Sequence, residues 1–142
     1  MSSVATIKRN IIPPHLEVKG GRPLSGILKV SGAKNSSLAL MAASILTKEK
    51  LLIKNVPQLT DIEVMAEILR HLGAKLTKTN NSLEINSRSI HNIELPYQLV
   101  HSLRASFFCV GPLLTRLGEA KIPLPGGCNI GARPVDEHIN GL

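Results

Sequence analysis

Apolar residues recur along the chain at helical spacing in some segments and in short runs in others. After Asp61 they return every three or four residues, which predicts an amphipathic helix over about 62–72 with Asp61 as its N-cap and Gly73 just past its end. A nearly continuous run of small and apolar residues predicts a second helix over about 36–46, buried on most sides. The apolar stripe of the helix predicted over 62–72 consists of Val64, Ile68, Leu69 and Leu72.

Short apolar runs bounded by Gly, Pro and Asn predict strands. The segment 15–30 has the pattern of two short strands, and 51–56 that of one strand. Residues 74–87 read as a hairpin with a two-asparagine turn. The segment 121–124 (KIPL) is expected to be a further strand. Alternating helices and strands place the chain in the α/β class.

The second half predicts a helix over 99–117, kinked at the Gly-Pro pair of residues 111–112, and a last helix that begins at Pro134. Two stretches echo each other weakly, SILTKEKLLIKNVP (44–57) and PLLTRLGEAKIPLP (112–125), each a helix followed by a strand. The loop after the second copy is expanded, and the last helix stops abruptly. We therefore expect a piece of a longer chain.

Composition narrows the range of functions. Of 142 residues 43% are apolar but only 2% aromatic, so the core is aliphatic and base-stacking modules are disfavoured. A net charge of +7 favours anionic partners, although a solvated basic surface is the simpler alternative. The sequence has no signal peptide and no apolar run of membrane length, and its two cysteines form no disulfide framework. These features predict a cytoplasmic protein with reduced thiols.

The two cysteines lie in contrasting surroundings. Cys128 follows two glycines and precedes Arg133 and the helix start at Pro134, and positive charge with helix-terminal amides stabilises a thiolate. Cys128 is therefore a candidate reactive thiol, and the alternative is a surface-loop cysteine without a task. Cys109 lies inside an apolar segment and is expected to be an inert packing residue.

Two basic positions are candidates for anion binding. In SGAKNSS (31–37), Lys34 and Asn35 stand where a strand turns into a helix, so backbone amides and the ammonium can form an anion cradle. The alternative is a solvated helix cap. Arg104 lies at the edge of an apolar segment, where its guanidinium either grips a phosphate or extends to water.

Three motifs together carry a resemblance: SGAKN (31–35), LRAS (103–106) and PGGCNIGARPVDEHINGL (125–142). The chain from about residue 16 onward resembles the N-terminal part of the UDP-N-acetylglucosamine 1-carboxyvinyltransferases, within the enolpyruvyl transferase family. That resemblance implies two inside-out α/β barrels of repeated βαβαββ units with the active site between them, of which this chain holds an incomplete part. Residues 1–14 would be a flexible tail, 15–33 strands that pack with the C-terminal domain, and 34–142 part of the N-terminal domain.

The resemblance also implies an activity. The family transfers the enolpyruvyl group of phosphoenolpyruvate to the 3′-hydroxyl of UDP-N-acetylglucosamine by addition and elimination, and releases phosphate. This reaction is the first committed step of peptidoglycan synthesis. It implies two small-molecule partners, no cofactor, no metal, no nucleic acid and no membrane. The C-terminal domain would be needed to complete the cleft, so this chain alone is expected to be inactive.

Roles follow residue by residue from the same resemblance. Lys34 and Asn35 match the phosphoenolpyruvate-binding pair, and Arg104 matches a substrate-binding arginine. Cys128 matches the proton donor, which also forms a covalent adduct with phosphoenolpyruvate and is alkylated by fosfomycin. The nucleotide-sugar-binding run matches Arg133, Pro134, Val135, Asp136, Glu137 and His138. Many members carry leucine where this sequence has Glu137, which puts that contact in doubt.

Other functions stay open at this point. A 5-enolpyruvylshikimate-3-phosphate synthase shares the fold and the donor, but the Cys128 loop and the Lys34-Asn35 pair favour the UDP-sugar enzyme. A small basic nucleic-acid-binding module is suggested only by the net charge. The third alternative is a non-catalytic remnant that binds a ligand or partner without turnover.

Overall fold

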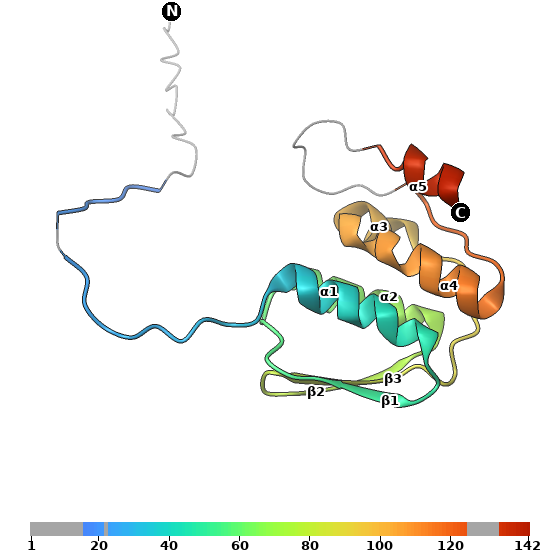
Figure 1. The fold of residues 1–142 in the computed structure, drawn as a ribbon, viewed down its shortest axis with the longest axis horizontal. Coiled ribbons are helices and arrows are strands. Elements are labelled where there is room, and N and C mark those ends of the chain that lie inside the picture. The colour runs from blue at the N-terminus through green and yellow to red at the C-terminus, as the bar shows by residue number, and fades with distance from the viewer. Residues whose placement is uncertain (1–15, 22, 125–133) are drawn as a thin grey trace, which may run out of the picture.

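The computed structural model describes residues 16–21, 23–124 and 134–142. Figure 1 shows the arrangement of the helices and strands in this part of the chain. In chain order the elements are α1 (Lys34–Ala43), the 3-10 helix η1 (Ser44–Leu46), β1 (Lys50–Ile53), α2 (Thr60–Leu72), β2 (Lys75–Thr79), β3 (Ser82–Asn86), α3 (Tyr97–Ser102), the 3-10 helix η2 (Arg104–Cys109), α4 (Val110–Leu117) and α5 (Asp136–Gly141).

The sheet has three antiparallel strands in the order β1-β3-β2. Ile85 in the central strand pairs with Leu51 on one side and Leu76 on the other. Alternation along β3 buries Leu83 and Ile85 on one face, because successive side chains of a strand point to opposite faces. The other face carries polar side chains such as Glu84, so only one face of the sheet is covered.

Helices α1 and α2 lie side by side over the apolar face of the sheet, and α3, η2 and α4 form a further layer above them (Figure 1). Apolar side chains from all three layers make one continuous core. The largest fully buried side chains are those of Leu38, Met41, Ile45, Met65, Ile68, Leu69, Leu72, Ile85, Leu95, Val100, Cys109 and Leu113.

Several elements form where the sequence pattern places them. Helix α1 with η1, helix α2 and the β2–β3 hairpin are confirmed within a few residues. Gly73 ends α2 with φ of 107°, and a Cβ atom there would lie 2.6 Å from the carbonyl oxygen of Ser89. Only glycine fits such a position without strain. At the hairpin turn Asn80 has φ of 48°, a conformation that asparagine tolerates.

The predicted cap of α2 is wrong. The helix begins at Thr60, its N-cap residue is Leu59, and no side chain caps it. Asp61 lies inside the first turn, where a carboxylate is favourable beside the positive end of the helix dipole. Its side chain instead pairs with Lys34. The local sequence pattern cannot predict this contact, because the two residues are far apart in the chain.

The single kinked helix predicted over 99–117 is wrong as well. The helical path breaks at Leu103, which is extended (φ −135°, ψ 102°) and buried, and this residue separates α3 from η2. The Gly-Pro pair at 111–112 lies in the first turn of α4. Proline is tolerated there because its missing N–H group would have no intrahelical partner.

Three further local predictions need correction. In the segment 121–124 the structure has one parallel bridge, between Glu94 and Lys121, and no strand. The last helix begins at Asp136, two residues after Pro134. The described part of 15–30 is extended but belongs to no strand, because a strand needs a neighbour that supplies hydrogen bonds.

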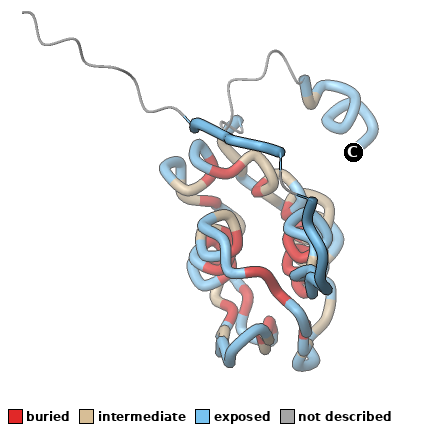
Figure 2. The backbone as a smooth tube through the Cα atoms, turned by 90° about the vertical axis from the view of Figure 1, so that its left-hand side faces the viewer, coloured by how far each residue is buried: buried red, intermediate tan, exposed pale blue. Residues whose placement is uncertain are grey.

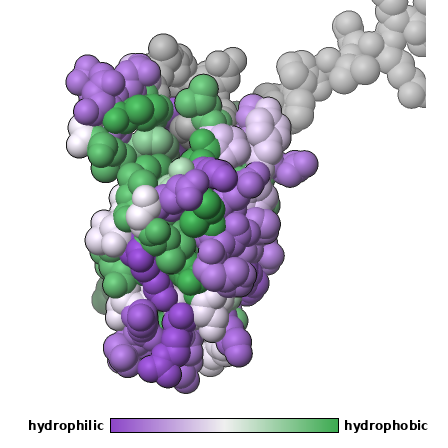
Figure 3. Space-filling model, turned by 90° about the vertical axis from the view of Figure 1, so that its right-hand side faces the viewer, coloured by the Kyte–Doolittle hydropathy of each residue, from purple (hydrophilic) through white to green (hydrophobic). Residues whose placement is uncertain are grey.

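In the extended segment before α1, the described residues from 16 to 31 are all exposed (Figure 2). On the face shown in Figure 3, hydrophilic side chains dominate the lower part, where the sheet lies, and hydrophobic ones gather higher up. None of the helices among the described residues has both the length and the apolar character needed to cross a membrane. Large apolar side chains exposed in the segment are those of Leu16, Val18, Leu24, Ile27, Leu28 and Val30.

Candidate functional site

The junction that leads into α1 is closely packed against another loop. A Cβ atom on Gly32 would lie 1.8 Å from the carbonyl oxygen of Asn55, so any residue other than glycine would push the two backbones apart. Asn55 itself has φ of 57°. The glycine of the SGAKN motif is therefore required by this contact, which fixes where α1 begins.

Lys34 and Asn35 are the first two residues of α1, and both are exposed. The ammonium Nζ of Lys34 donates to Oδ2 of Asp61 at 2.6 Å. The side chains retain 45% and 36% of their accessible surface, so an anion in solution can still reach this ion pair. Lys34 carries a positive charge at the helix end where anions are favoured and cations are not.

Arg104 is the first residue of η2 and is partly buried. Helix η2 packs directly against α1, so the elements that carry Lys34 and Arg104 are neighbours. Two residues further on, the hydroxyl of Ser106 is buried and has no hydrogen-bond partner. A buried hydroxyl without a partner is uncommon and costs stability.

The residues from Pro134 to His138 lead into and form the first half of α5. All of them are exposed except Val135, which is half-buried. The imidazole of His138 meets the ring of Phe107 edge to face, with 5.7 Å between the ring centroids and an interplanar angle of 87°. This contact places the start of α5 beside η2, the element that begins with Arg104.

Helix η2 thus neighbours two other elements that carry predicted site residues: α1, which packs against it, and α5, which it meets through the Phe107–His138 contact. Cys128 and Arg133 lie outside the described residues. Cys109 is fully buried, 4.0 Å from the sulfur of Met65, and burial raises the pKa of its thiol from 9.0 to about 12. Its expected role as an inert packing residue is confirmed.

The described residues also form a small pocket that includes none of the predicted site residues. It lies between α2 and the hairpin and is lined by apolar side chains and by the ion-paired Glu63, Arg70 and Lys78. No group of three or more His, Cys, Asp or Glu side chains among the described residues could hold a metal ion.

Asp61 is the residue that sequence reasoning placed wrongly. The sequence pattern predicts it as the cap of α2, whereas its carboxylate lies against Lys34, 27 positions earlier in the chain. The packing of α1 on α2 creates this contact. The only signal in the sequence is a carboxylate at a helix start, which predicts a cap just as well.

Comparison with known families places the chain. The model of the EPSP synthase (3-phosphoshikimate 1-carboxyvinyltransferase) family matches residues 18–142. The chain therefore belongs to the EPSP synthase family of enolpyruvyl transferases, and its expected fold class is confirmed.

Individual relatives are more specific. The chain is 93% identical over all 142 residues to a UDP-N-acetylglucosamine 1-carboxyvinyltransferase of Prochlorococcus marinus (strain NATL2A), and covers 31% of that protein. A protein of the same name from strain MIT 9301 is 62% identical over 128 residues, which cover 90% of this chain and 28% of the relative. The chain thus spans about a third of the length of the curated relatives that it matches.

A solved structure gives the same result for the fold. The enolpyruvyl transferase NikO from Streptomyces tendae superposes with a TM-score of 0.63 at 29% sequence identity. The match covers 70% of this chain and 23% of NikO.

Proposed function

We propose that this chain supplies part of the active site of an enzyme that transfers the enolpyruvyl group of phosphoenolpyruvate to the 3′-hydroxyl of UDP-N-acetylglucosamine. The observation that carries the proposal is the 93% identity over all 142 residues to relatives that bear the name of this activity. An enzyme for shikimate 3-phosphate is the second candidate, since the family model carries that name. The level of identity favours the UDP-sugar. The enzyme would act in the cytoplasm, in the first committed step of peptidoglycan synthesis.

The charges of the described residues suit two anionic substrates. Lys34 and Asn35 would bind phosphoenolpyruvate at the start of α1, where backbone amides also favour an anion. Arg104 would contribute a guanidinium from the neighbouring η2. The nucleotide sugar would lie along Arg133, Pro134, Val135, Asp136, Glu137 and His138. Glu137, exposed in the first turn of α5, adds a negative charge to this run.

The reaction needs one proton donor and one base. The Cys128 thiol would give its proton to the methylene carbon of phosphoenolpyruvate while the sugar 3′-oxygen adds to the neighbouring carbon. The hydroxyl proton would pass to a base outside these 142 residues. Loss of a proton from the new methyl group, together with departure of inorganic phosphate, would then restore the carbon–carbon double bond. No cofactor is needed for these steps.

The remainder of the enzyme would complete the cleft. Residues 15–33 would pack with the C-terminal domain, since the described part of this segment exposes six large apolar side chains and belongs to no strand here. We therefore expect no turnover from the 142-residue chain by itself. Its partners would be the two small-molecule substrates and this domain, and neither nucleic acid nor membrane.

The experiment uses a full-length chimera in which these 142 residues are followed by the remaining part of the NATL2A relative. We expect phosphate release with phosphoenolpyruvate and UDP-N-acetylglucosamine, and none with shikimate 3-phosphate as acceptor. Cys128→Ser should lower kcat by about 100-fold or more, because a positioned acid contributes on that scale. Cys109→Ala is the control for loss of the other thiol and should retain turnover. Release with shikimate 3-phosphate alone would establish the second candidate instead.

Fosfomycin provides a chemical check of the same site. Mass spectrometry should find one adduct, on Cys128, and none on Cys109, whose buried thiol is protonated at neutral pH. An adduct on Cys109, or an unmodified Cys128 in an active chimera, would contradict the assignment of the reactive thiol.

A further inference from the structure

We propose that Asp61 is a positioning residue for Lys34: its carboxylate holds the ammonium in the place where the phosphoenolpyruvate anion is received. This inference rests on the function proposed above, since it takes Lys34 as a substrate-binding residue. It adds a residue that belongs to none of the three motifs that carry the family resemblance. The observation that supports it is the contact of 2.6 Å between Nζ of Lys34 and Oδ2 of Asp61.

The two side chains come from rigid elements. Lys34 opens α1, whose start is fixed by the close contact between Gly32 and Asn55. Asp61 lies in the first turn of α2, and Ile62 beside it is buried in the core. Helices α1 and α2 pack directly against each other, so the distance between the two backbones is set by the fold.

A lysine needs such a partner if its ammonium is to act at one point. Its side chain has four rotatable bonds, and holding it in one conformation costs conformational entropy. The first turn of a helix also disfavours a cation. Asp61 offsets that unfavourable position and restricts the ammonium, while both groups remain open enough for a second anion to approach.

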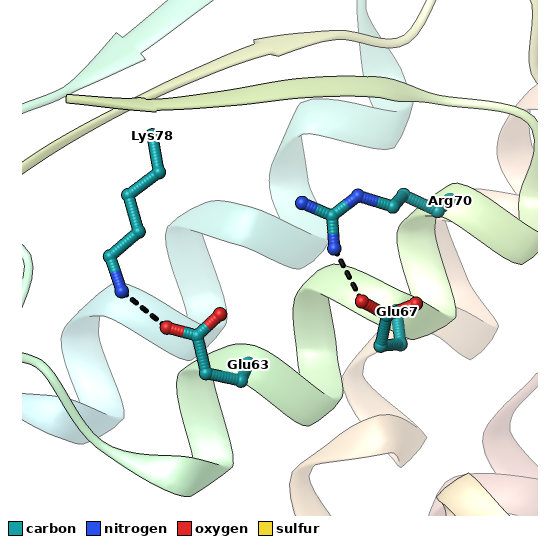
Figure 4. A network of polar contacts seen from close by, with 4 residues as sticks. All are labelled: Glu63, Glu67, Arg70 and Lys78. Carbon is teal, nitrogen blue, oxygen red and sulfur yellow. Dashed lines mark hydrogen bonds and ion pairs between the residues drawn. The ribbon is translucent and has the colours of Figure 1, made fainter.

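The other ion pairs of α2 show the contrast. Figure 4 shows Glu63 paired with Lys78 and Glu67 paired with Arg70, with 2.6 Å between Nη1 of Arg70 and Oε1 of Glu67. Neither pair includes a predicted site residue. Exposed pairs of this kind contribute little to stability. Loss of Asp61 should therefore leave the fold intact, so that an effect on turnover can be read separately.

The test is made in the full-length chimera described above, after its turnover has been established. We expect Asp61→Asn to lower kcat by about tenfold or more, because misplacing a group by about 1 Å costs up to 100-fold. The KM for phosphoenolpyruvate should change less than kcat, since what is lost is the placement of the ammonium as charge develops. Asp61→Glu should recover much of the loss.

Glu63→Gln is the matched control, because it removes a neighbouring carboxylate of the same helix and also breaks an ion pair. We expect its kcat to stay within about twofold of the parent and the midpoints of thermal unfolding of all variants to agree. Asp61→Asn with a parental kcat would overturn the proposal. The proposal would also be overturned if Asp61→Asn and Asp61→Glu lost kcat equally and both had a lowered midpoint of thermal unfolding.

A second measurement separates this inference from the proposed function. In the 142-residue chain, the ammonium resonance of Lys34 is observed by NMR with ¹⁵N-labelled lysine. Asp61→Asn should shift the Lys34 resonance. Glu63→Gln should leave the Lys34 resonance in place and shift the resonance of Lys78 instead. An unchanged Lys34 signal in Asp61→Asn would overturn the proposal directly. An inactive parental chimera with a shifted Lys34 signal would instead overturn the proposed function and leave only the ion pair.

Discussion

At the scale of single residues, the thiol of Cys109 links burial to pH dependence. Its folded-state pKa is raised to about 12 by desolvation, above the ordinary value of 9.0 for a cysteine. Below about pH 9 both the folded and the unfolded chain hold the thiol proton, so the contribution of this group to the free energy of unfolding is fully present. As the pH rises further, the unfolded chain releases the proton and the folded chain does not. The free energy of unfolding then falls.

We expect a loss of up to about 1.4 kcal/mol per pH unit from this group between pH 9 and 12. Urea unfolding of the parent and of Cys109→Ala at about pH 8 and about pH 10 would measure it, because other alkaline groups cancel in the comparison. The stability advantage of the parent should shrink at the higher pH. An advantage of equal size at both values would contradict the prediction.

Residue-scale features of the site were predictable only in part. The motif SGAKN indicates a turn before a helix that the pattern predicts from about residue 36, and in the structure the helix begins two residues earlier, at Lys34. The partner of Gly32 was not predictable, because Asn55 reaches it through the left-handed turn after β1. Contacts of this kind depend on the path of the backbone, which residue types alone do not determine.

At the scale of elements, Arg116 joins α4 to two other segments. Its Nη1 donates to the carbonyl oxygens of Ile45 (2.7 Å) and Thr47 (3.1 Å), and its Nη2 to that of Arg88 (3.2 Å). The first two acceptors lie at the end of η1, where helical carbonyls otherwise lack partners. One partly buried guanidinium therefore closes the α1–η1 helix and fixes α4 beside it.

Arg116→Met should destabilise the chain by about 1.5–3 kcal/mol, because hydrogen bonds from a charged donor are lost and carbonyl groups are left without it. Arg70→Met is the control, since its exposed bond to Glu67 within one helix is worth only about 0.3–0.5 kcal/mol. Urea unfolding of both variants measures the difference. Equal losses would show that Arg116 acts as an ordinary surface residue.

Periodicity predicted those elements whose local signals and packing agree. Helix α2 has both an apolar stripe and a terminal glycine, and the hairpin has alternation and a turn. The break at Leu103 has no such signal, because the residue turns extended in order to bury its side chain. The Gly-Pro pair that suggested a kink is accommodated instead in the first turn of α4.

At the scale of the whole molecule, the structure divides into a packed body and an exposed extended segment. The body places its core between the sheet and the helices, whereas residues before α1 contribute no buried apolar side chain among those described. Sequence reasoning found the class and the family, because motifs and composition are properties of the chain. It did not find how the segment is held, since strand pairing needs a neighbour that the pattern does not identify.

Limited trypsin digestion should show this division. Cleavage after Lys29, in the exposed segment, should precede cleavage after Arg70, which is exposed on the surface of α2 but held in the helix. Mass spectrometry over a time course would follow both products. Lys29→Gln should remove the early product and leave the later one unchanged. Equal rates at the two sites would mean that the segment is protected.

The exposed segment also has a consequence for synthesis. It leaves the ribosome ahead of the body, and at about 5–20 residues per second the remaining residues follow over roughly 5–20 s. During that interval, and in the folded structure of these residues as well, six large apolar side chains from Leu16 to Val30 have no folded surface to cover them. Nascent-chain chaperones that recognise short apolar stretches would meet this segment first, before any helix of the core exists.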